Sequence, residues 1–246
     1  MKLLVCICKT PDTTAKIAFK DNGKAFDPAG VSFMMNPYDE WYALVRAIEL
    51  REQTGGTVTV INVGPPEEDV VIRKALAIGA DDAVRVNAVP RDALFVARQI
   101  ANYALDKGFD MILTGKETID YNGSLVGGML AEMLDLPFVS YVNHLEVADN
   151  KATLTREIEG GVEVAEVALP LVCSAAKGLA EQRIPNMRGI MLSKSKPLTV
   201  IEPAEQAEQR AETTYTLPPK KSSVHMVDAD KMDELVRLLR EEAKVI

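Results

Sequence analysis

Apolar runs and amphipathic stretches alternate along the first half of the chain. A continuous apolar run is typical of a strand buried on both faces of a parallel sheet, and one occurs at residues 3–8. Further strands are predicted at residues 57–63, 83–86 and 111–114. Apolar residues at helical spacing, bounded by proline and glycine, predict helices at about 37–54, 67–78, 91–107 and 124–134. Strands that alternate with helices in this way predict a doubly wound, mostly parallel α/β sheet.

The pattern changes after Pro137. Apolar and polar residues alternate, as they do in antiparallel strands, over 140–147, 152–158 and 162–168, and a buried run follows at 171–174. We therefore expect a β-meander added to one edge of the sheet. Earlier in the chain, two short strand-like pieces flank the turn signal Asn22-Gly23.

The C-terminal stretch differs from both of these regions. From Lys196-Pro197 to His225 the chain is rich in proline and poor in apolar residues, which favours an extended arm. Residues 230–244 carry a narrow apolar stripe at helical spacing. The sequence therefore predicts a nucleotide-binding α/β domain over 1–196 and, over 197–246, an arm that ends in a helix. We expect this arm to contact a partner subunit, although a helix that packs on its own domain fits the pattern equally well.

Composition excludes several classes of protein. The net charge of −8 and the isoelectric point of about 5.0 argue against general binding to nucleic acid or to a membrane surface. The three cysteines are too few for a disulfide framework, and the two histidines lie far apart, so we predict no metal site. No apolar stretch approaches the roughly 18 residues of a membrane span, and the first apolar run is too short for a signal sequence. We expect a cytoplasmic protein with no membrane insertion.

Three loops follow predicted strands where a ligand would bind. In doubly wound sheets, ligands lie beyond the carboxyl ends of the strands, where the strand order reverses. Residues 9–12, 64–66 and 115–123 occupy such places. The third loop leads into a helix, where Gly123 permits close approach and Ser124 is expected to act as the cap. The free N–H groups of that first turn suit a phosphate. An ordinary capped loop is the alternative.

Motifs for catalysis are missing from the sequence. It contains no G-x-x-x-x-G-K-[ST] phosphate loop, no G-x-G-x-x-G after the first strand and no G-x-S-x-G nucleophile elbow. Histidine is too scarce for a convincing triad. A phosphate site without a nucleophile, base or metal cluster indicates binding rather than turnover, so we predict no catalytic residues.

Several segments together resemble electron-transfer flavoprotein beta subunits. The resemblance spans residues 2 to about 200, and its landmarks in chain order are 9–12, 35–39, 64–65, 75–81, 115–127, 156–161 with Pro170, and 183–187. Each segment is a weak signal alone, but seven in the correct order are a strong one. Ala165 and Cys173 depart from the residues that are usual in the family's signature block.

The resemblance implies a heterodimer that carries electrons. In typical members this subunit binds AMP structurally, and FAD lies mainly on the alpha subunit. The matching positions here are Ile7, Asn36, Pro37, Tyr38, Asp39, Val63, Gly115, Lys116, Glu117, Thr118, Ile119, Asp120, Tyr121, Asn122, Gly123, Ser124, Leu125 and Val126. By this resemblance Ile7 and Val63 flank the adenine, the last segment wraps the phosphate, and Tyr38 lies near the edge of the flavin.

The resemblance also implies docking partners. The stretch 183–191 is similar to the loop with which the family docks dehydrogenases, and Ile184, Pro185 and Met187 are the expected contact residues. A core aliphatic is the alternative for Ile184, but its polar neighbours favour an exposed loop. Electrons are expected to pass from dehydrogenases to a downstream quinone reductase or another acceptor.

Three alternatives remain open. Val126 stands where AMP-binding members place a hydroxyl, which is similar to electron-bifurcating members that hold a second FAD instead of AMP. Those members usually carry a further acidic residue where this chain has Asn122 and Gly123, so we favour AMP. An adenylating enzyme would need a Ser/Gly-rich loop after the first strand, which residues 9–14 do not supply. A free-standing adenine-nucleotide-binding stress protein would lack both the 183–191 loop and the arm.

Overall fold

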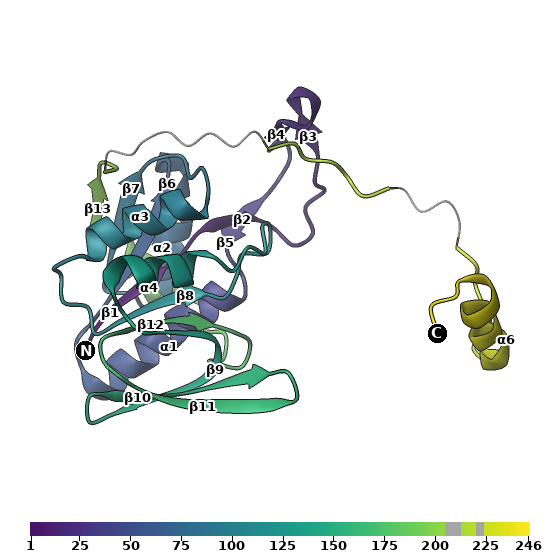
Figure 1. Ribbon diagram of the computed structural model, residues 1–246. Coiled ribbons are helices and arrows are strands. Elements are labelled where there is room, and N and C mark those ends of the chain that lie inside the picture. The colour runs from purple at the N-terminus through teal and green to yellow at the C-terminus, as the bar shows by residue number, and fades with distance from the viewer. Residues whose placement is uncertain (205–212, 220–223) are drawn as a thin grey trace. The chain divides into compact units, whose positions relative to one another are not determined.

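A nine-stranded sheet forms the centre of the protein (Figure 1). The computed structural model describes residues 1–204, 213–219 and 224–246. The strand order is β11-β10-β9-β12-β8-β1-β6-β7-β13. In chain order these strands are β1 (Lys2–Cys6), β6 (Thr57–Gly64), β7 (Asp82–Asn87), β8 (Met111–Gly115), β9 (Phe138–Ala148), β10 (Lys151–Ile158), β11 (Gly161–Ala168), β12 (Leu171–Ala175) and β13 (Leu198–Ile201).

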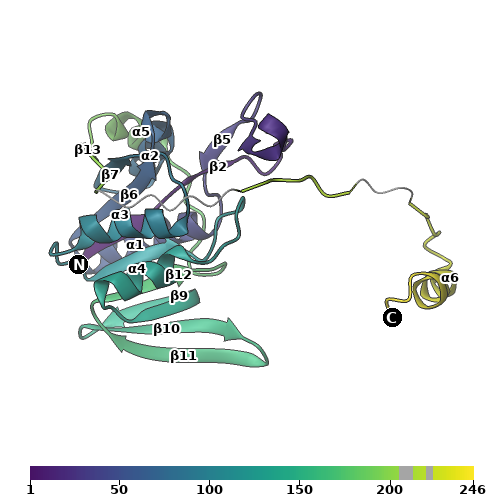
Figure 2. The ribbon, with the colours of Figure 1, turned by 45° about the horizontal axis from the view of Figure 1, so that its top comes forward.

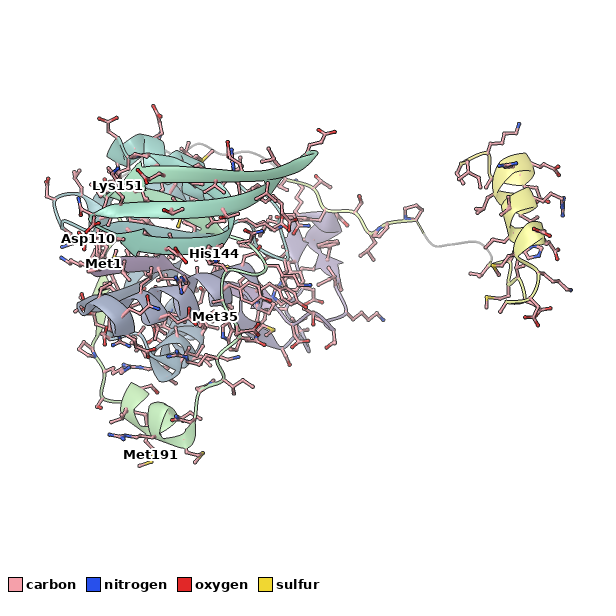
Figure 3. All side chains as sticks on the ribbon, turned by 90° about the horizontal axis from the view of Figure 1, so that it is seen from below. Met1, Met35, Asp110, His144, Lys151 and Met191 are labelled. Carbon is pink, nitrogen blue, oxygen red and sulfur yellow. The ribbon has the colours of Figure 1, made fainter. Side chains whose placement is uncertain are left out.

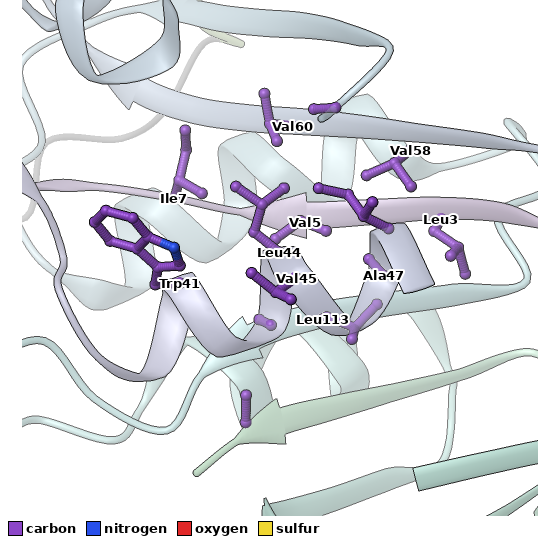
Figure 4. Packing of buried hydrophobic residues seen from close by; sticks show 14 of the residues in the cluster. Leu3, Val5, Ile7, Trp41, Leu44, Val45, Ala47, Val58, Val60 and Leu113 are labelled. Atoms are coloured by element: carbon purple, nitrogen blue, oxygen red, sulfur yellow. The ribbon is translucent and has the colours of Figure 1, made fainter. Parts of the chain in front are cut away.

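Helices cover both faces of the parallel part of this sheet. Helices α1 (Asp39–Thr54) and α2 (Asp69–Ile78) pack on one face, and α3 (Ala93–Ala104) and α4 (Val126–Leu134) pack on the other (Figure 2). Strand β1 alternates between the two: Leu3 and Val5 join the α1 cluster, shown in Figure 4, whereas Leu4 joins the α3 cluster. Burial on both faces explains the continuous apolar run, and the predicted doubly wound fold is confirmed.

The strand order reverses at β1. From β1 the chain adds β6 and then β7 on one side, each strand parallel to its neighbour. It then crosses back and places β8 on the other side of β1, in register from Leu3 opposite Met111. The carboxyl ends of β1, β6 and β8 therefore meet at the switch point of the sheet, where doubly wound folds bind ligands.

The predicted meander extends one edge of the sheet. Strands β9, β10 and β11 pair antiparallel in sequence order. Strand β12 then returns and lies between β8 and β9, parallel to both. The buried run at 171–174 is thus an interior strand, as the sequence indicates.

Strand β13 is missing from the predicted elements. The sequence predicts that residues 198–201 begin the arm, but they pair in parallel with β7, with Leu198 opposite Ala83. Four residues of β-branched or apolar type suit an edge strand. Their signal was hidden because Pro197 and Pro203 enclose it on both sides. The rest of the predicted arm lies partly outside the described residues, over 205–212 and 220–223.

A second compact unit comprises residues 17–28 and 210–246. Its short strands β3 (Phe19–Lys20) and β4 (Ala25–Phe26) form the hairpin predicted around Asn22-Gly23. Tyr215 joins this hairpin: its N–H donates to the Gly23 carbonyl at 2.7 Å, and its ring stacks on Phe19 with centroids 5.1 Å apart. The predicted C-terminal helix is α6 (Met232–Arg237), continued by a π-helical stretch at 238–242.

Two short strands and a short helix also belong to the larger compact unit. Strands β2 (Lys9–Pro11) and β5 (Phe33–Met35) pair antiparallel just before α1, and α5 (Met187–Ser193) lies between β12 and β13. Figure 3 shows Met191 on α5 at the opposite end of the domain from Lys151 in the meander. Within the described part of the chain, no helix is long and apolar enough to cross a membrane.

Candidate functional site

The loops at the switch point are tied to one another through buried amides. The Asn62 side chain, at the end of β6, donates to the Ile7 carbonyl at 3.1 Å and to Glu68 Oε2 at 2.9 Å. The Ile7 N–H in turn donates to the Ile61 carbonyl at 2.9 Å. The chain after β1 is therefore held against the end of β6, with its path fixed on both sides.

Asn36 ties the loop after β8 to the start of α1. Its Nδ2 donates to the Glu117 carbonyl at 3.0 Å, and its Oδ1 accepts from the Ile119 N–H at 3.3 Å. Its own N–H donates to the Cys8 carbonyl at 3.1 Å, and the residue is fully buried. The Asn36 side chain thus pairs with the loop as a neighbouring strand would, because its amide bonds to one main-chain carbonyl and one main-chain N–H.

We expect Asn36→Ala to loosen this loop. Removing the amide leaves Glu117 O and Ile119 N–H without their partner, a loss of about 1–3 kcal/mol. For a chain of this size that corresponds to a fall in melting temperature of roughly 3–10 °C. Calorimetry checks the fall, with the exposed Asn102→Ala as the matched control. Equal melting temperatures for both variants would show that the amide is dispensable.

The loop from Gly115 to Leu125 takes an unusual path. Asn122 and Ser124 are left-handed, with φ of 49° and 51°, a conformation that is uncommon outside glycine and concentrates at functional sites. Gly115 is needed because a Cβ there would lie 2.9 Å from Glu40 Cγ. No acceptor in the described part of the chain takes the N–H groups of the first turn of α4, so this end of the helix attracts an anion.

The expectation that Ser124 caps this helix is wrong. Helix α4 begins at Val126, its N-cap is Leu125, and no side chain caps it. The left-handed conformation of Ser124 is incompatible with an N-cap, and its hydroxyl lies 3.4 Å from the Tyr141 hydroxyl instead. The N–H groups of the first turn of α4 therefore have no side-chain cap and can bind an anion.

Three carboxyl groups gather behind the loop. Burial raises the pKa of Glu40 to about 8, against the opposing effect of the Cys8 N–H, which donates to its Oε2 at 2.7 Å. Burial also raises the pKa of Asp39 to about 6, although Lys116 at 3.8 Å opposes the rise. The pKa of Glu68 is raised by burial as well, and Lys9 at 3.4 Å lies beside it. This side of the site favours hydroxyl donors over a phosphate.

The predicted apolar pair does not form a side-chain clamp. Ile7 and Val63 are both buried, but Ile7 belongs to the α1 cluster and Val63 to the α3 cluster. Their side chains therefore point to opposite faces of the sheet. Tyr38, Tyr121 and Leu125 are exposed near this end of the sheet.

The predicted docking loop is exposed. We call residues 183–193, which contain this loop and α5, the docking segment. Ile184 is 79% exposed and Met187 is 75% exposed, so Ile184 is not a core aliphatic. Asn186 caps α5 by accepting from the Gly189 N–H at 2.8 Å. An exposed isoleucine next to a structured helix end suits an interface anchor.

Some of the residues that build the site were not predicted. Four residues that contact the loops are not among the predicted site residues: Glu40, Asn62, Glu68 and Tyr141. Of these residues, Asn62 could be predicted from the sequence, because it is a polar residue near the carboxyl end of a mostly apolar strand. Glu40 follows the predicted stretch 36–39 directly. Within the described ranges, no three His, Cys, Asp or Glu side chains are placed to hold a metal ion.

Comparisons with known proteins place this architecture in a family. The electron transfer flavoprotein domain matches residues 25–206. The electron transfer flavoprotein subunit beta of Bacillus subtilis (strain 168) is 39% identical over 260 residues, covering 100% of both chains. The mitochondrial subunit beta of Oryza sativa subsp. japonica is 31% identical over 256 residues, again 100% of both. The acryloyl-CoA reductase electron transfer subunit gamma of Anaerotignum propionicum is 32% identical over 209 residues, 82% of this chain and 78% of its own.

The fold and the strand-end loops define a doubly wound α/β protein with a candidate ligand site at its switch point. The chain belongs to the family of electron transfer flavoprotein beta subunits. It is therefore one component of an electron carrier, and the resemblance read from the sequence is confirmed.

Proposed function

We propose that this chain pairs with an alpha subunit that holds most of the FAD, and that it binds one AMP as a structural ligand. The complex carries electrons from dehydrogenases to a downstream quinone reductase or another acceptor. The observation that carries the AMP proposal is the loop from Gly115 to Val126, which Asn36 fixes and which ends at the uncapped N-terminus of α4.

The charges of the site suggest how AMP lies in it. The phosphate is proposed to bind the N–H groups at the start of α4, because the carboxyl groups of Asp39 and Glu40 would repel it. Those carboxyl groups suit the hydroxyls of the ribose, and the main chain at Ile7 and Val63 suits the base. The residues present therefore fit a small nucleotide with a single phosphate. FAD supplies the redox chemistry when bound, while this chain positions it, with Tyr38 near its edge.

The docking part of the proposal rests on Ile184. Its side chain is exposed beside Met187 on a structured segment, as an anchor for a dehydrogenase pocket would be. Pro185 lies between the cap of α5 and Ile184 and restricts the backbone there. The arm and helix that follow β13 are proposed to contact the alpha subunit, and the cytoplasmic location stays a prediction.

A second FAD in place of AMP is the other candidate. Val126 offers no hydroxyl at the first position of α4. A relative with 32% identity is named as the electron transfer subunit of an acryloyl-CoA reductase. A FAD would use the same uncapped helix end for its pyrophosphate.

Acid extraction of the purified complex, co-expressed with its alpha subunit, tests this function. We expect one AMP and one FAD per heterodimer on chromatography, because Asn36 fixes one loop, 115–126, which leads to the start of α4 at the switch point. The Asn36→Ala complex should release less AMP with the same FAD. Two FAD and no AMP would support the second candidate, whereas one FAD and no other nucleotide would contradict both.

A further inference from the structure

The docking segment is fixed to the domain at its C-terminal end. Arg73, on α2, donates from one nitrogen to the carbonyls of Ser193 and Lys196, both at 2.7 Å. Gly189 lies directly against the same helix, because a Cβ at this position would be 2.3 Å from the Ala77 carbonyl oxygen. Helix α5 is therefore seated on α2.

Its N-terminal end is fixed to α1 through Arg183. The Trp41 indole N–H donates to the Arg183 carbonyl at 3.1 Å. The Arg183 guanidinium donates to both carboxylate oxygens of Glu52, at 2.8 and 3.1 Å. Trp41 and Glu52 are about three turns apart on α1 and so share one face of the helix. This face holds both the main chain and the side chain of the residue that precedes Ile184.

The two contacts to Arg183 differ in character. Trp41 is only 5% exposed, and the Lys74 ammonium lies 4.5 Å from its ring centroid, so its indole is fixed in place. The Arg183–Glu52 pair is partly exposed and adds little to stability. Its two parallel hydrogen bonds nevertheless set the orientation of the guanidinium. The contacts of Arg183 with Trp41 and Glu52 together order the backbone beside Ile184 before a partner binds, and this order lowers the entropy cost of binding.

We propose that Trp41 and Glu52 are positioning residues that preset the docking segment through Arg183. The proposal rests on the docking role of Ile184, which supplies the contact itself. Trp41 and Glu52 act from α1 and need no contact with the dehydrogenase. Their loss therefore weakens docking without changing the electron-transfer step once the partner is bound.

Steady-state electron transfer from a dehydrogenase to the intact heterodimer tests this role. Glu52→Gln breaks the ion pair, and we expect it to raise the KM for the flavoprotein about 2- to 5-fold. Trp41→Phe keeps a ring but removes the donor, and we expect a rise of about 2- to 10-fold. In both variants kcat should stay unchanged, and amide hydrogen exchange at 183–186 should become faster. Lys151→Gln breaks an exposed pair with Glu166 in the distant meander and is the matched control.

A double-mutant cycle with Ile184→Ala separates positioning from direct contact. If Trp41 and Glu52 act by positioning Ile184, then Trp41→Phe and Glu52→Gln cause no further rise in KM once Ile184 is alanine. Two results would overturn the positioning role alone. One is that the effects of the paired substitutions on KM are additive. The other is that Ile184→Ala raises KM while Glu52→Gln and Trp41→Phe leave it unchanged. If Ile184→Ala itself leaves KM unchanged, the docking proposal fails and this inference falls with it.

Discussion

Ile184→Ala is expected to lower the efficiency of electron transfer from a partner dehydrogenase by about 5- to 150-fold. The side chain is 79% exposed, so its apolar surface is available to a partner. Truncating an anchor of this kind removes about 1–3 kcal/mol of binding free energy. Folding should barely change, because an exposed side chain contributes little to the core. Kinetics with increasing flavoprotein, beside a thermal melt, measure both quantities.

The matched control is Val89→Ala, which truncates another exposed aliphatic side chain, in the loop before α3. It should leave electron transfer and melting temperature as they are. The AMP content and the chemical reduction of the flavin should also be the same in the Ile184→Ala complex. If Ile184→Ala behaves like Val89→Ala in the kinetic assay, the docking contact lies elsewhere on the surface.

Glu40→Gln is expected to stabilise the protein at alkaline pH. Burial raises the pKa of Glu40 to about 8 in the folded chain, far above that of an exposed glutamate. Between the two values the folded state holds the proton more tightly than the unfolded state does. The free energy of unfolding therefore falls as pH rises from about 4.5 to about 8. Glutamine carries no charge to bury, and its oxygen still accepts from the Cys8 N–H.

Melting curves across this pH range measure the difference. Near pH 5 wild type and Glu40→Gln should have the same melting temperature. Near pH 8.5 the glutamine variant should be more stable by about 1–3 kcal/mol, or several degrees. Glu132→Gln, which changes an exposed carboxyl group on α4, should show no such gap. If the difference in stability between wild type and Glu40→Gln is the same at every pH, Glu40 is not a buried acid.

The fold is largely readable because most strands are buried on both faces. The run at 3–8 carries a strong signal, since the helices on each face of the sheet favour apolar residues at successive positions of the strand. Strand β13 is not predicted from the sequence because it is a short edge strand between two prolines. It is recognised as a strand only from its pairing with β7. Local composition cannot show which neighbour a four-residue segment will find.

The site is less readable because its contacts are made over long distances in sequence. The stretch 115–126 is recognisable as a loop between strand and helix. The amide of Asn36 that fixes it lies some eighty residues earlier and was named only through resemblance. The residue type of Ser124 suits a helix cap, but its backbone is left-handed and its hydroxyl lies 3.4 Å from the Tyr141 hydroxyl. Residue type predicts what a side chain can do, and the tertiary structure decides which partner it meets.

The position of β12 has a consequence for how the chain folds during synthesis. Strand β8 emerges from the ribosome long before β12, yet β12 must occupy the place beside it, between β8 and β9. The meander β9–β10–β11 can form early because its pairing is local, but it cannot join the parallel sheet until residue 175 is available. Until then one side of β8 is an open edge, and such edges are prone to pair with other chains. A nascent chain of this protein is therefore most in need of a chaperone between the synthesis of β8 and that of β12.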